Sequence, residues 1–267
     1  MEMSHSAFLR MLAMDAGLIM RKYHHVSGVP YSLKPDKTRV TAADKKIGEY
    51  VARQFREYYP SGVCIREETD FPLRTGGGFE GVFDEIDGTL EFSRGGLYAV
   101  FAGAVMLDHQ VWNSIIYAPL LDEQPTYEAV VGLGAFCNNR PIHVSKKKAH
   151  PKIEVTTAGV TNELYKASAV ISELGLCGCD VSDVLSISFS CALLAEGKTE
   201  GVLFPWTTLH DIVPGSLLVK EAGGIITDLN GRDLDLSQNA VEGFIAANCK
   251  DTHDMLLNVA QRNRQRT

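Results

Sequence analysis

Residues 81–92 constrain the fold of this chain most, because they predict a strand, a tight turn and a helix start in direct succession. A short apolar run at 81–83 ends in one carboxylate, Asp84, and a second carboxylate, Asp87, follows three residues later. A glycine and a threonine come next, and this pair is suited to the start of a helix. The stretch therefore places two acids where a strand turns into a helix.

The chemistry that this stretch suits is the binding of a metal ion together with a phosphate group. Two carboxylates on either side of a tight turn can converge on one point, and their hard oxygen atoms favour Mg²⁺, Mn²⁺ or Ca²⁺. Gly88 lets the backbone approach a ligand closely, and the free N–H groups at a helix start attract an anion. A capped surface turn is the alternative that these residues alone leave open.

The composition excludes several classes of protein. The 267 residues are 45% hydrophobic and carry a net charge of −7, so one large domain or two lobes can form around a substantial core. The negative charge argues against binding to a nucleic-acid polymer or a membrane surface. No apolar run reaches about 18 residues, and the first residues lack the basic start and apolar core of a secretion signal. We expect a cytoplasmic protein in which bound cations neutralise any anionic substrate.

The six cysteines are too few for a disulfide framework in a chain of this length, which also favours a cytoplasmic location with reduced thiols. Cys177 and Cys179 are separated by one glycine and could bind a soft metal. No second pair of cysteines or histidines follows at zinc spacing, which argues against a zinc site.

Hydrophobic periodicity in the rest of the chain predicts an α/β pattern. The composition becomes polar and basic around Lys146, which indicates an N-terminal α+β lobe at 1–148 and a C-terminal α/β lobe at 149–267. The predicted helices are 3–23, 41–58, 162–174, 183–196, 211–222 and 252–262, and the predicted strands are 63–65, 97–107, 111–118, 127–131, 133–144, 153–157, 201–204, 225–228 and 243–247. The two strands at 97–107 and 111–118 should form a hairpin.

Five short motifs follow one another along the chain. Residues 40–44 read V-T-A-A-D, residues 66–68 read R-E-E, and residues 84–89 read D-E-I-D-G-T. Residues 134–145 contain G-A-F-C-N and I-H-V-S, and residues 211–224 contain D-I-V-P-G and E-A-G-G. Taken together, these motifs resemble those of the inositol monophosphatase family of metal-dependent phosphatases, and the resemblance covers nearly the whole chain.

The resemblance implies a layered αβαβα sandwich with a metal site where the two lobes meet. It further implies two or three Mg²⁺ ions, with Mn²⁺ possible, a small phosphorylated substrate, a homodimer and inhibition by Li⁺. The metal ligands that it implies are Glu68, Asp84, Asp87, Asp211 and the carbonyl of Ile86. Thr89, linked to Asp44, would orient the attacking water, and Glu68 would share in catalysis. The N–H groups of Gly88 and Thr89 would hold the phosphate.

The chain departs from the family pattern at three positions near this predicted site. Arg66 stands where the family has a glycine, Glu85 where it has a proline, and His210 where it has a tryptophan. None of these changes removes a predicted ligand, although two of them add charge close to the site. We expect Arg66 and Glu85 to point outward.

Substrate choice is open at this level. A gapless count from Asp211 places Leu185 and Phe204 where inositol-processing members have a small residue and a hydroxyl-binding acid, which argues against inositol phosphate. These two residues and His210 are the predicted substrate pocket, and core positions for Leu185 and Phe204 are the alternative. Residues 90–92 resemble the corresponding stretch of the family's bisphosphate nucleotidases. Inositol or sugar phosphates, fructose bisphosphate, a 3′(2′),5′-nucleoside bisphosphate and histidinol phosphate therefore remain candidates.

The physical argument for a phosphatase is independent of the resemblance. Phosphate monoesters are dianions that repel nucleophiles, so their hydrolysis needs cations and an activated water. Four carboxylates from separate segments would repel one another unless cations bound between them. The leading hypothesis is a Mg²⁺-dependent phosphomonoesterase. A catalytically weak sensor of a phosphorylated ligand and a protein with one structural cation are the two alternatives.

Overall fold

The computed structural model describes residues 3–35, 37–68, 78–155, 167–238, 240–241 and 243–264. The helices are α1 His5–Tyr23, α2 Ala42–Tyr58, α3 Thr89–Ser93, α4 Ala167–Leu176, α5 Ile187–Ala195, α6 Leu209–Glu221 and α7 Lys250–Arg264. The strands are β1 Tyr31–Leu33, β2 Arg39–Thr41, β3 Val63–Arg66, β4 Phe79–Asp87, β5 Val100–Leu107, β6 Gln110–Tyr117, β7 Thr126–Val130, β8 Gly134–Cys137, β9 Arg140–Ile142, β10 Lys152–Val155, β11 Asp180–Ser182, β12 Gly201–Phe204, β13 Thr207–Thr208, β14 Ile225–Asp228, β15 Ala240–Val241 and β16 Phe244–Ala247.

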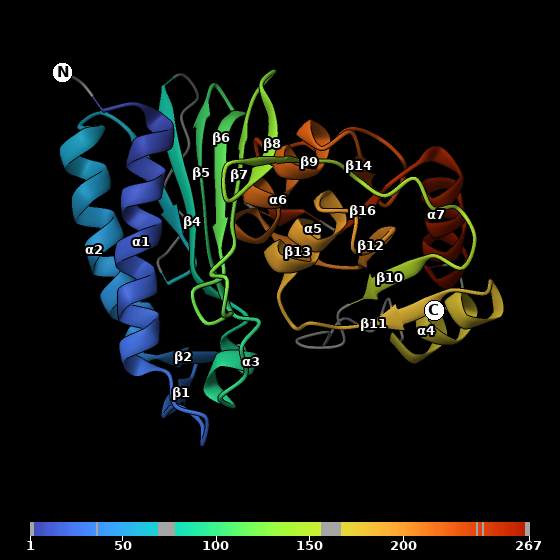
Figure 1. The fold of residues 1–267 in the computed structure, drawn as a ribbon, viewed down its shortest axis with the longest axis horizontal. Helices are drawn as coiled ribbons and strands as arrows, with labels where there is room; N and C mark the ends of the chain where they lie inside the picture. The colour runs from blue at the N-terminus through green and yellow to red at the C-terminus, as the bar shows by residue number, and fades with distance from the viewer. Residues whose placement is uncertain are drawn as a thin grey trace.

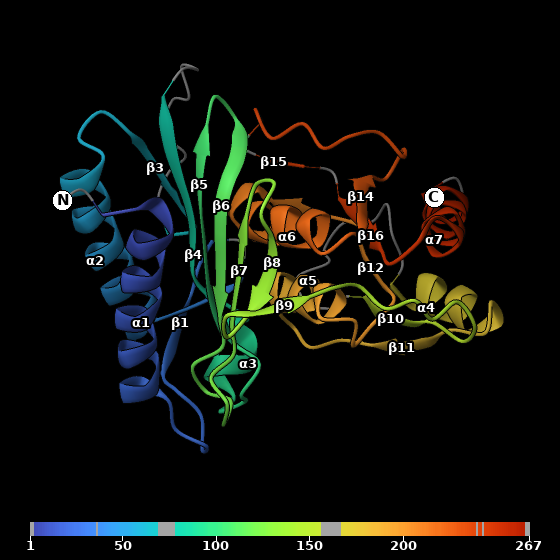
Figure 2. The ribbon, with the colours of Figure 1, turned by 45° about the horizontal axis from the view of Figure 1, so that its top comes forward.

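The elements stack in layers, as Figures 1 and 2 show from two directions. The pair α1 and α2 covers one face of a seven-stranded sheet of order β3-β4-β5-β6-β7-β8-β9, and α5 and α6 cover the other face. A five-stranded sheet of order β11-β10-β12-β16-β14 follows, and α4 and α7 close the far side. This arrangement confirms the predicted αβαβα sandwich.

The first layer forms because α1 and α2 each bury one stripe of apolar side chains. Phe8, Leu12, Ala16 and Met20 recur along α1 at a spacing of four residues, and all of them are buried against the seven-stranded sheet or α2. Such spacing places side chains on one face of a helix. The predicted hairpin is also present, because β5 and β6 pair in antiparallel fashion through a tight turn at 108–109.

The chain passes from the first sheet to the second between β9 and β10. The predicted lobe boundary between 148 and 149 falls in this connection and stays a prediction. Within the described ranges, none of the helices has the length and apolarity that crossing a bilayer requires.

The helices in the second half begin at other residues than predicted. The predicted helix 183–196 begins only at Ile187, because Leu185 adopts a left-handed φ of 60° and the hydroxyl of Ser186 caps the helix by accepting from the N–H of Phe189 at 3.2 Å. The predicted helix 162–174 is described only from Ala167, and residues 156–166 lie outside the described ranges.

Pro214 lies deeper in its helix than expected. The helix α6 begins at Leu209 rather than at Asp211, so Pro214 falls in the second turn instead of the first. It has no N–H for the helical bond to the carbonyl four residues earlier. The earlier start places Asp211 at the third helical position, where its carboxylate accepts from the N–H of the N-cap residue Thr208.

Candidate metal centre

Acidic side chains from distant segments converge where β4 ends and the helices α5 and α6 begin. Three groups each offer ligand atoms that all lie within 4.8 Å of one another, and the groups share members. The groups are Asp84 with Asp87 and Asp211, Asp44 with Glu67 and Glu68, and Glu67 with Asp84 and His210. The structure thus brings all four predicted carboxylates into one continuous cluster.

The turn between β4 and α3 is built around Gly88 and Thr89. Gly88 has a φ of 93°, and a Cβ atom there would meet the carbonyl oxygen of Leu185 at 3.2 Å, so a side chain would be strained and crowded. The Thr89 hydroxyl lies 2.9 Å from the carbonyl oxygen of Ile86, to which it donates, and 3.3 Å from Oδ1 of Asp44. These contacts connect the turn to the start of α2.

Asp44 serves the start of α2 as well as the cluster. Its Oδ2 accepts from the N–H of Thr41 at 2.8 Å and from the Thr41 hydroxyl at 2.5 Å, which completes a capping box. The side chain is fully buried. Burial raises the pKa of Asp44 to about 6, although the two hydrogen bonds from Thr41 act in the opposite direction.

The carboxylate of Asp87, the last residue of β4, lies against the N-terminus of α5. Its Oδ2 accepts from the N–H of Ser188 at 2.5 Å and its Oδ1 accepts from the N–H of Ile187 at 3.2 Å. Exposed N–H groups and the helix dipole stabilise a negative charge at such a position. The late start of α5 at Ile187 is therefore what brings this helix terminus to Asp87.

Asp211 is held in the first turn of α6. Its Oδ2 accepts from the N–H of Thr208 at 2.9 Å and from the Thr208 hydroxyl at 2.7 Å. The Nε2 atom of His210 lies 2.7 Å from the same Thr208 hydroxyl oxygen and 3.7 Å from Oδ1 of Asp211. Burial lowers the pKa of His210, which favours a neutral imidazole.

Glu67 is a member of the cluster that sequence reasoning did not select. It lies with Asp84 in one group and with Glu68 in another, whereas Glu68 does not share a group with Asp84. The ammonium group of Lys34 lies 2.6 Å from Glu67 and 2.8 Å from Glu68. The paired acids were visible in the sequence, but their orientation was not, because β3 ends at Arg66 and strand alternation stops there.

The acids at the centre of the cluster are buried, and burial raises their pKa values. Burial, reinforced by Glu67, raises the pKa of Asp84 well above its usual range. Burial likewise raises the pKa of Glu67 to about 7 and that of Asp87 to about 7. The Oδ1 atom of Asp84 is buried and has no hydrogen-bond partner among the described residues. An orphaned buried oxygen amid mutually repelling carboxylates fits a divalent cation with hard oxygen ligands.

Arg66 and Glu85 do not point outward, so that expectation is wrong. The Arg66 guanidinium donates from Nη1 to Oε1 of Glu85 at 2.9 Å, and the Glu85 side chain is 0% exposed. A Cβ atom at position 48 would overlap both groups, so Gly48 in α2 provides the space for the pair. Burial raises the pKa of Glu85 to about 8 even though Arg66 lowers it.

The three predicted pocket residues have different surroundings. Phe204 is 1% exposed and stacks on Phe244 with ring centroids 5.4 Å apart. It is therefore a core residue, which was the alternative to a pocket position. Leu185 contributes its backbone beside Gly88. Only His210 joins a group with the acids.

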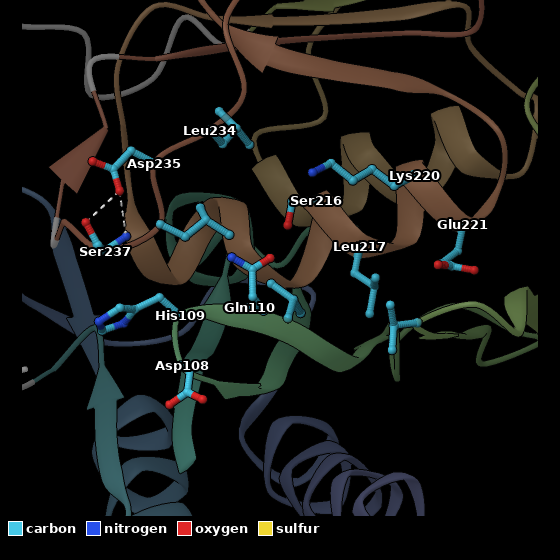
Figure 3. A pocket seen from close by; sticks show the side chains of 13 residues that line it. Asp108, His109, Gln110, Ser216, Leu217, Lys220, Glu221, Leu234, Asp235 and Ser237 are labelled. Carbon is cyan, nitrogen blue, oxygen red and sulfur yellow. Dashed lines mark hydrogen bonds between the residues drawn. The ribbon is translucent and has the colours of Figure 1, made fainter. Parts of the chain in front are cut away.

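A separate pocket lies between the β5–β6 turn, the C-terminal half of α6 and the loop at 234–237, with a volume of ≈ 450 Å³. Figure 3 shows the side chains that line it, among them His109, Lys220 and Glu221. None of the predicted site residues lines this pocket. The acid cluster is therefore a different part of the molecule.

Comparison with known proteins shows the family to which the chain belongs. The sequence profile of the inositol monophosphatase family matches residues 4–265. Proteins that match this profile are phosphatases, that is, hydrolases of phosphomonoesters. The chain belongs to the inositol monophosphatase family.

Individual relatives are similar over most of their length. The chain is 27% identical over 250 residues to inositol monophosphatase 1 of Solanum lycopersicum, with 86% of each chain covered. It is 29% identical over 234 residues to the fructose-1,6-bisphosphatase of Pyrococcus furiosus, again with 86% of each covered. The solved structure of the Thermotoga maritima IMPase superposes with a TM-score of 0.84 over 96% of both chains at 21% identity, which is a likeness of fold.

Proposed function

We propose that this phosphatase of small phosphorylated metabolites depends on Mg²⁺ or a similar divalent cation held by the acid cluster. The observation that carries the proposal is the convergence of Asp84 and Asp87 from β4 with Asp211 from α6, with their ligand atoms within 4.8 Å of one another. Buried carboxylates at this spacing are costly unless cations bind between them.

The residues present fit two neighbouring cations. Asp84, Asp87 and Asp211 would hold one, and Glu67 together with Asp84 would hold another. The Ile86 carbonyl and Glu68 are further candidate ligands, as the family resemblance implies. Bound cations would supply charge neutralisation of the phosphate oxygens and a water of lowered pKa.

Other residues of the chain would position the reactants. Thr89 can orient a water with its hydroxyl, because the hydroxyl is already held between Ile86 and Asp44. Asp44, whose pKa lies near 6, can receive the hydroxyl proton of Thr89 when that hydroxyl rotates from the Ile86 carbonyl toward Oδ1 of Asp44, and the Thr89 oxygen would then take the proton of the water. The N–H groups of Gly88 and Thr89 open α3 and would donate to the phosphate.

The substrate is proposed only as a class. One similar protein is named an inositol monophosphatase and another a fructose-1,6-bisphosphatase, and both kinds of phosphate ester are candidates here. No acid occupies position 204, since Phe204 is a core residue, and this disfavours a hydroxyl-binding role for that position. Nucleoside bisphosphates and histidinol phosphate stay in the set. A homodimeric, cytoplasmic protein is part of the same proposal.

The test is a phosphate-release screen with and without Mg²⁺. The panel contains inositol phosphates, fructose 1,6-bisphosphate, adenosine 3′,5′-bisphosphate, NADP and histidinol phosphate. We expect Mg²⁺-stimulated release from at least one ester, its loss in Asp84→Asn, and its retention in Asp228→Asn, which alters the acid at the end of β14. Full activity of Asp84→Asn would refute the assignment.

The two alternatives give different outcomes in the same screen. Tight calorimetric binding of a panel member without turnover would identify a phospholigand sensor. Metal-dependent melting without affinity for any phosphate ester would identify a single structural cation.

A further inference from the structure

His210 is the nitrogen-bearing member of the acid cluster. A ring nitrogen of His210 lies within 4.8 Å of ligand oxygens of both Glu67 and Asp84, and these two oxygens also lie within 4.8 Å of each other. The residue is 6% exposed. Ligands on opposite sides of one metal ion are about 4 Å apart when each bond is about 2.1 Å long, so small side-chain movements would let all three atoms share an ion.

The hydrogen bonds around His210 assign its ring nitrogens. The Thr208 hydroxyl has one proton, and it donates that proton to Oδ2 of Asp211 at 2.7 Å. Its oxygen must then accept in the 2.7 Å contact with Nε2 of His210, so Nε2 carries the ring proton. In a neutral imidazole the lone pair is consequently on Nδ1.

This arrangement is the one that metal-binding histidines usually have. One ring nitrogen carries the lone pair, while the other donates its proton to a fixed oxygen that sets the ring orientation. Here that fixed oxygen is on Thr208, which also holds Asp211, so the two neighbouring side chains are oriented by one hydroxyl group.

A second observation at the same place fits a bound cation. The Oδ1 atom of Asp84 is buried, and no described residue donates a hydrogen bond to it. Asp84 is only 2% exposed and is in the same group as His210. A cation between Asp84, Glu67 and the imidazole would satisfy this oxygen.

We propose that His210 is a nitrogen ligand in the part of the metal centre formed by Glu67 and Asp84, and that it makes this part prefer a first-row transition-metal dication to Mg²⁺. Imidazole is a borderline ligand that suits transition metals, whereas Mg²⁺ favours oxygen ligands and water. The inference rests on the proposed metal centre and extends it to the identity of the ion.

The experiment uses Mn²⁺ as the probe, because its electron spin reports on neighbouring nitrogen nuclei. Full-length protein is stripped with EDTA and loaded with Mn²⁺, and electron spin-echo modulation is recorded for the wild type, His210→Gln, His210→Phe and His253→Gln. His253 is the matched control, because it is also buried and its Nε2 lies 2.8 Å from a threonine hydroxyl, that of Thr227. Calorimetry on the same samples gives the Kd values for Mn²⁺ and Mg²⁺.

We expect ¹⁴N modulation of the imidazole type in the wild type and in His253→Gln, and its loss in both His210 variants. The ratio of Mg²⁺ to Mn²⁺ dissociation constants should fall by about tenfold or more in the His210 variants, the scale on which changes around metal ligands alter affinity. Unchanged modulation in a folded His210 variant, or no ¹⁴N modulation in Mn²⁺-loaded wild type, would overturn the inference.

The outcome also separates this inference from the proposed function. Oxygen-only coordination with intact Mg²⁺-stimulated turnover would remove His210 as a ligand and leave the phosphatase proposal standing. A wild type that binds neither ion would remove the metal centre itself. If neither His210 variant folds, the wild-type spectrum decides, because no other histidine belongs to the cation-binding groups in the parts of the chain that the structure describes.

Discussion

Arg66 in β3 and Glu85 in β4 form a buried pair, with 2.9 Å between Nη1 of the arginine and Oε1 of the glutamate. Arg66 is the last residue of β3 and immediately precedes Glu67, whereas Glu85 follows Asp84 in β4. The strands are parallel, with Arg66 opposite Phe83. The pair therefore connects the segment that carries Glu67 to the segment that carries Asp84.

Breaking this pair from one side should be costly. Arg66→Met leaves the fully buried Glu85 carboxyl without its hydrogen-bond donor. Because the Glu85 pKa of about 8 allows this carboxyl to be protonated near neutral pH, we expect a loss of about 1–3 kcal/mol in the free energy of unfolding. The double variant Arg66→Met/Glu85→Met should recover most of that loss, because two apolar groups replace the two polar ones. Urea unfolding in EDTA measures both. As a control, Lys148→Met breaks an exposed pair with Asp251 and should cost less than about 1 kcal/mol. A double variant as unstable as the single one would contradict this account.

Lys34 should compete with the cations. Its ammonium group lies 2.6 Å from Glu67 and 2.8 Å from Glu68, and although burial lowers the pKa of Lys34, these two acids raise it. Lys34→Met removes a positive charge beside the cluster, so we expect Mn²⁺ to bind about 3- to 10-fold more tightly, a coupling of roughly 1 kcal/mol. Without metal, the variant should melt at a lower temperature than the wild type. Equal or weaker Mn²⁺ affinity, with Lys148→Met as the exposed control, would exclude competition.

The pH dependence of metal-free stability should carry the signature of Asp87. Its pKa is raised from 3.8 to about 7 by burial, so the folded state binds the proton more tightly than the unfolded state does. The contribution of Asp87 to stability is therefore fully present below about pH 4 and is lost as the pH rises through about 7. In EDTA, Asp87→Asn should gain stability relative to the wild type across this window.

A control acid should behave differently. The pKa of Asp228 is lowered: partial burial raises it, but hydrogen bonds from Arg232 and Asn230 lower it further. Its contribution is lost only as the pH falls below its ordinary value of 3.8, so Asp228→Asn should differ from the wild type by a constant amount between pH 5 and 8. Thermal melts at six pH values measure both differences. A flat difference for Asp87→Asn would contradict the buried, proton-binding state.

Thr89 should matter through its hydroxyl group. Thr89→Ala removes the group held between Ile86 and Asp44, and we expect turnover to fall by about 10²- to 10⁴-fold, the usual contribution of positioned proton transfer. Thr89→Ser keeps the hydroxyl and should stay within about tenfold of the wild type. Steady-state phosphate release with saturating metal measures both. Equal activity of the alanine and serine variants would remove Thr89 from the reaction.

Much of the architecture could be predicted because its causes are local. The apolar stripe of α1, the capping box of Thr41 with Asp44 and the turn at Gly88 each depend on residues a few positions apart. The predicted start of α5 was wrong. Hydrophobic periodicity does not show that Leu185 adopts a left-handed conformation, or that the helix begins only after the cap at Ser186.

The sequence by itself determined which acids could meet a cation, since Asp84 and Asp87 are fixed by one strand, one turn and one helix start. Only the tertiary structure decided that Glu67 lies beside Asp84, that His210 joins them, and that Arg66 turns inward to Glu85. The physical reason is that the direction of these side chains is set by burial and by partners many residues away. The spacing of residues along the chain does not show which charged side chains will lie opposite each other.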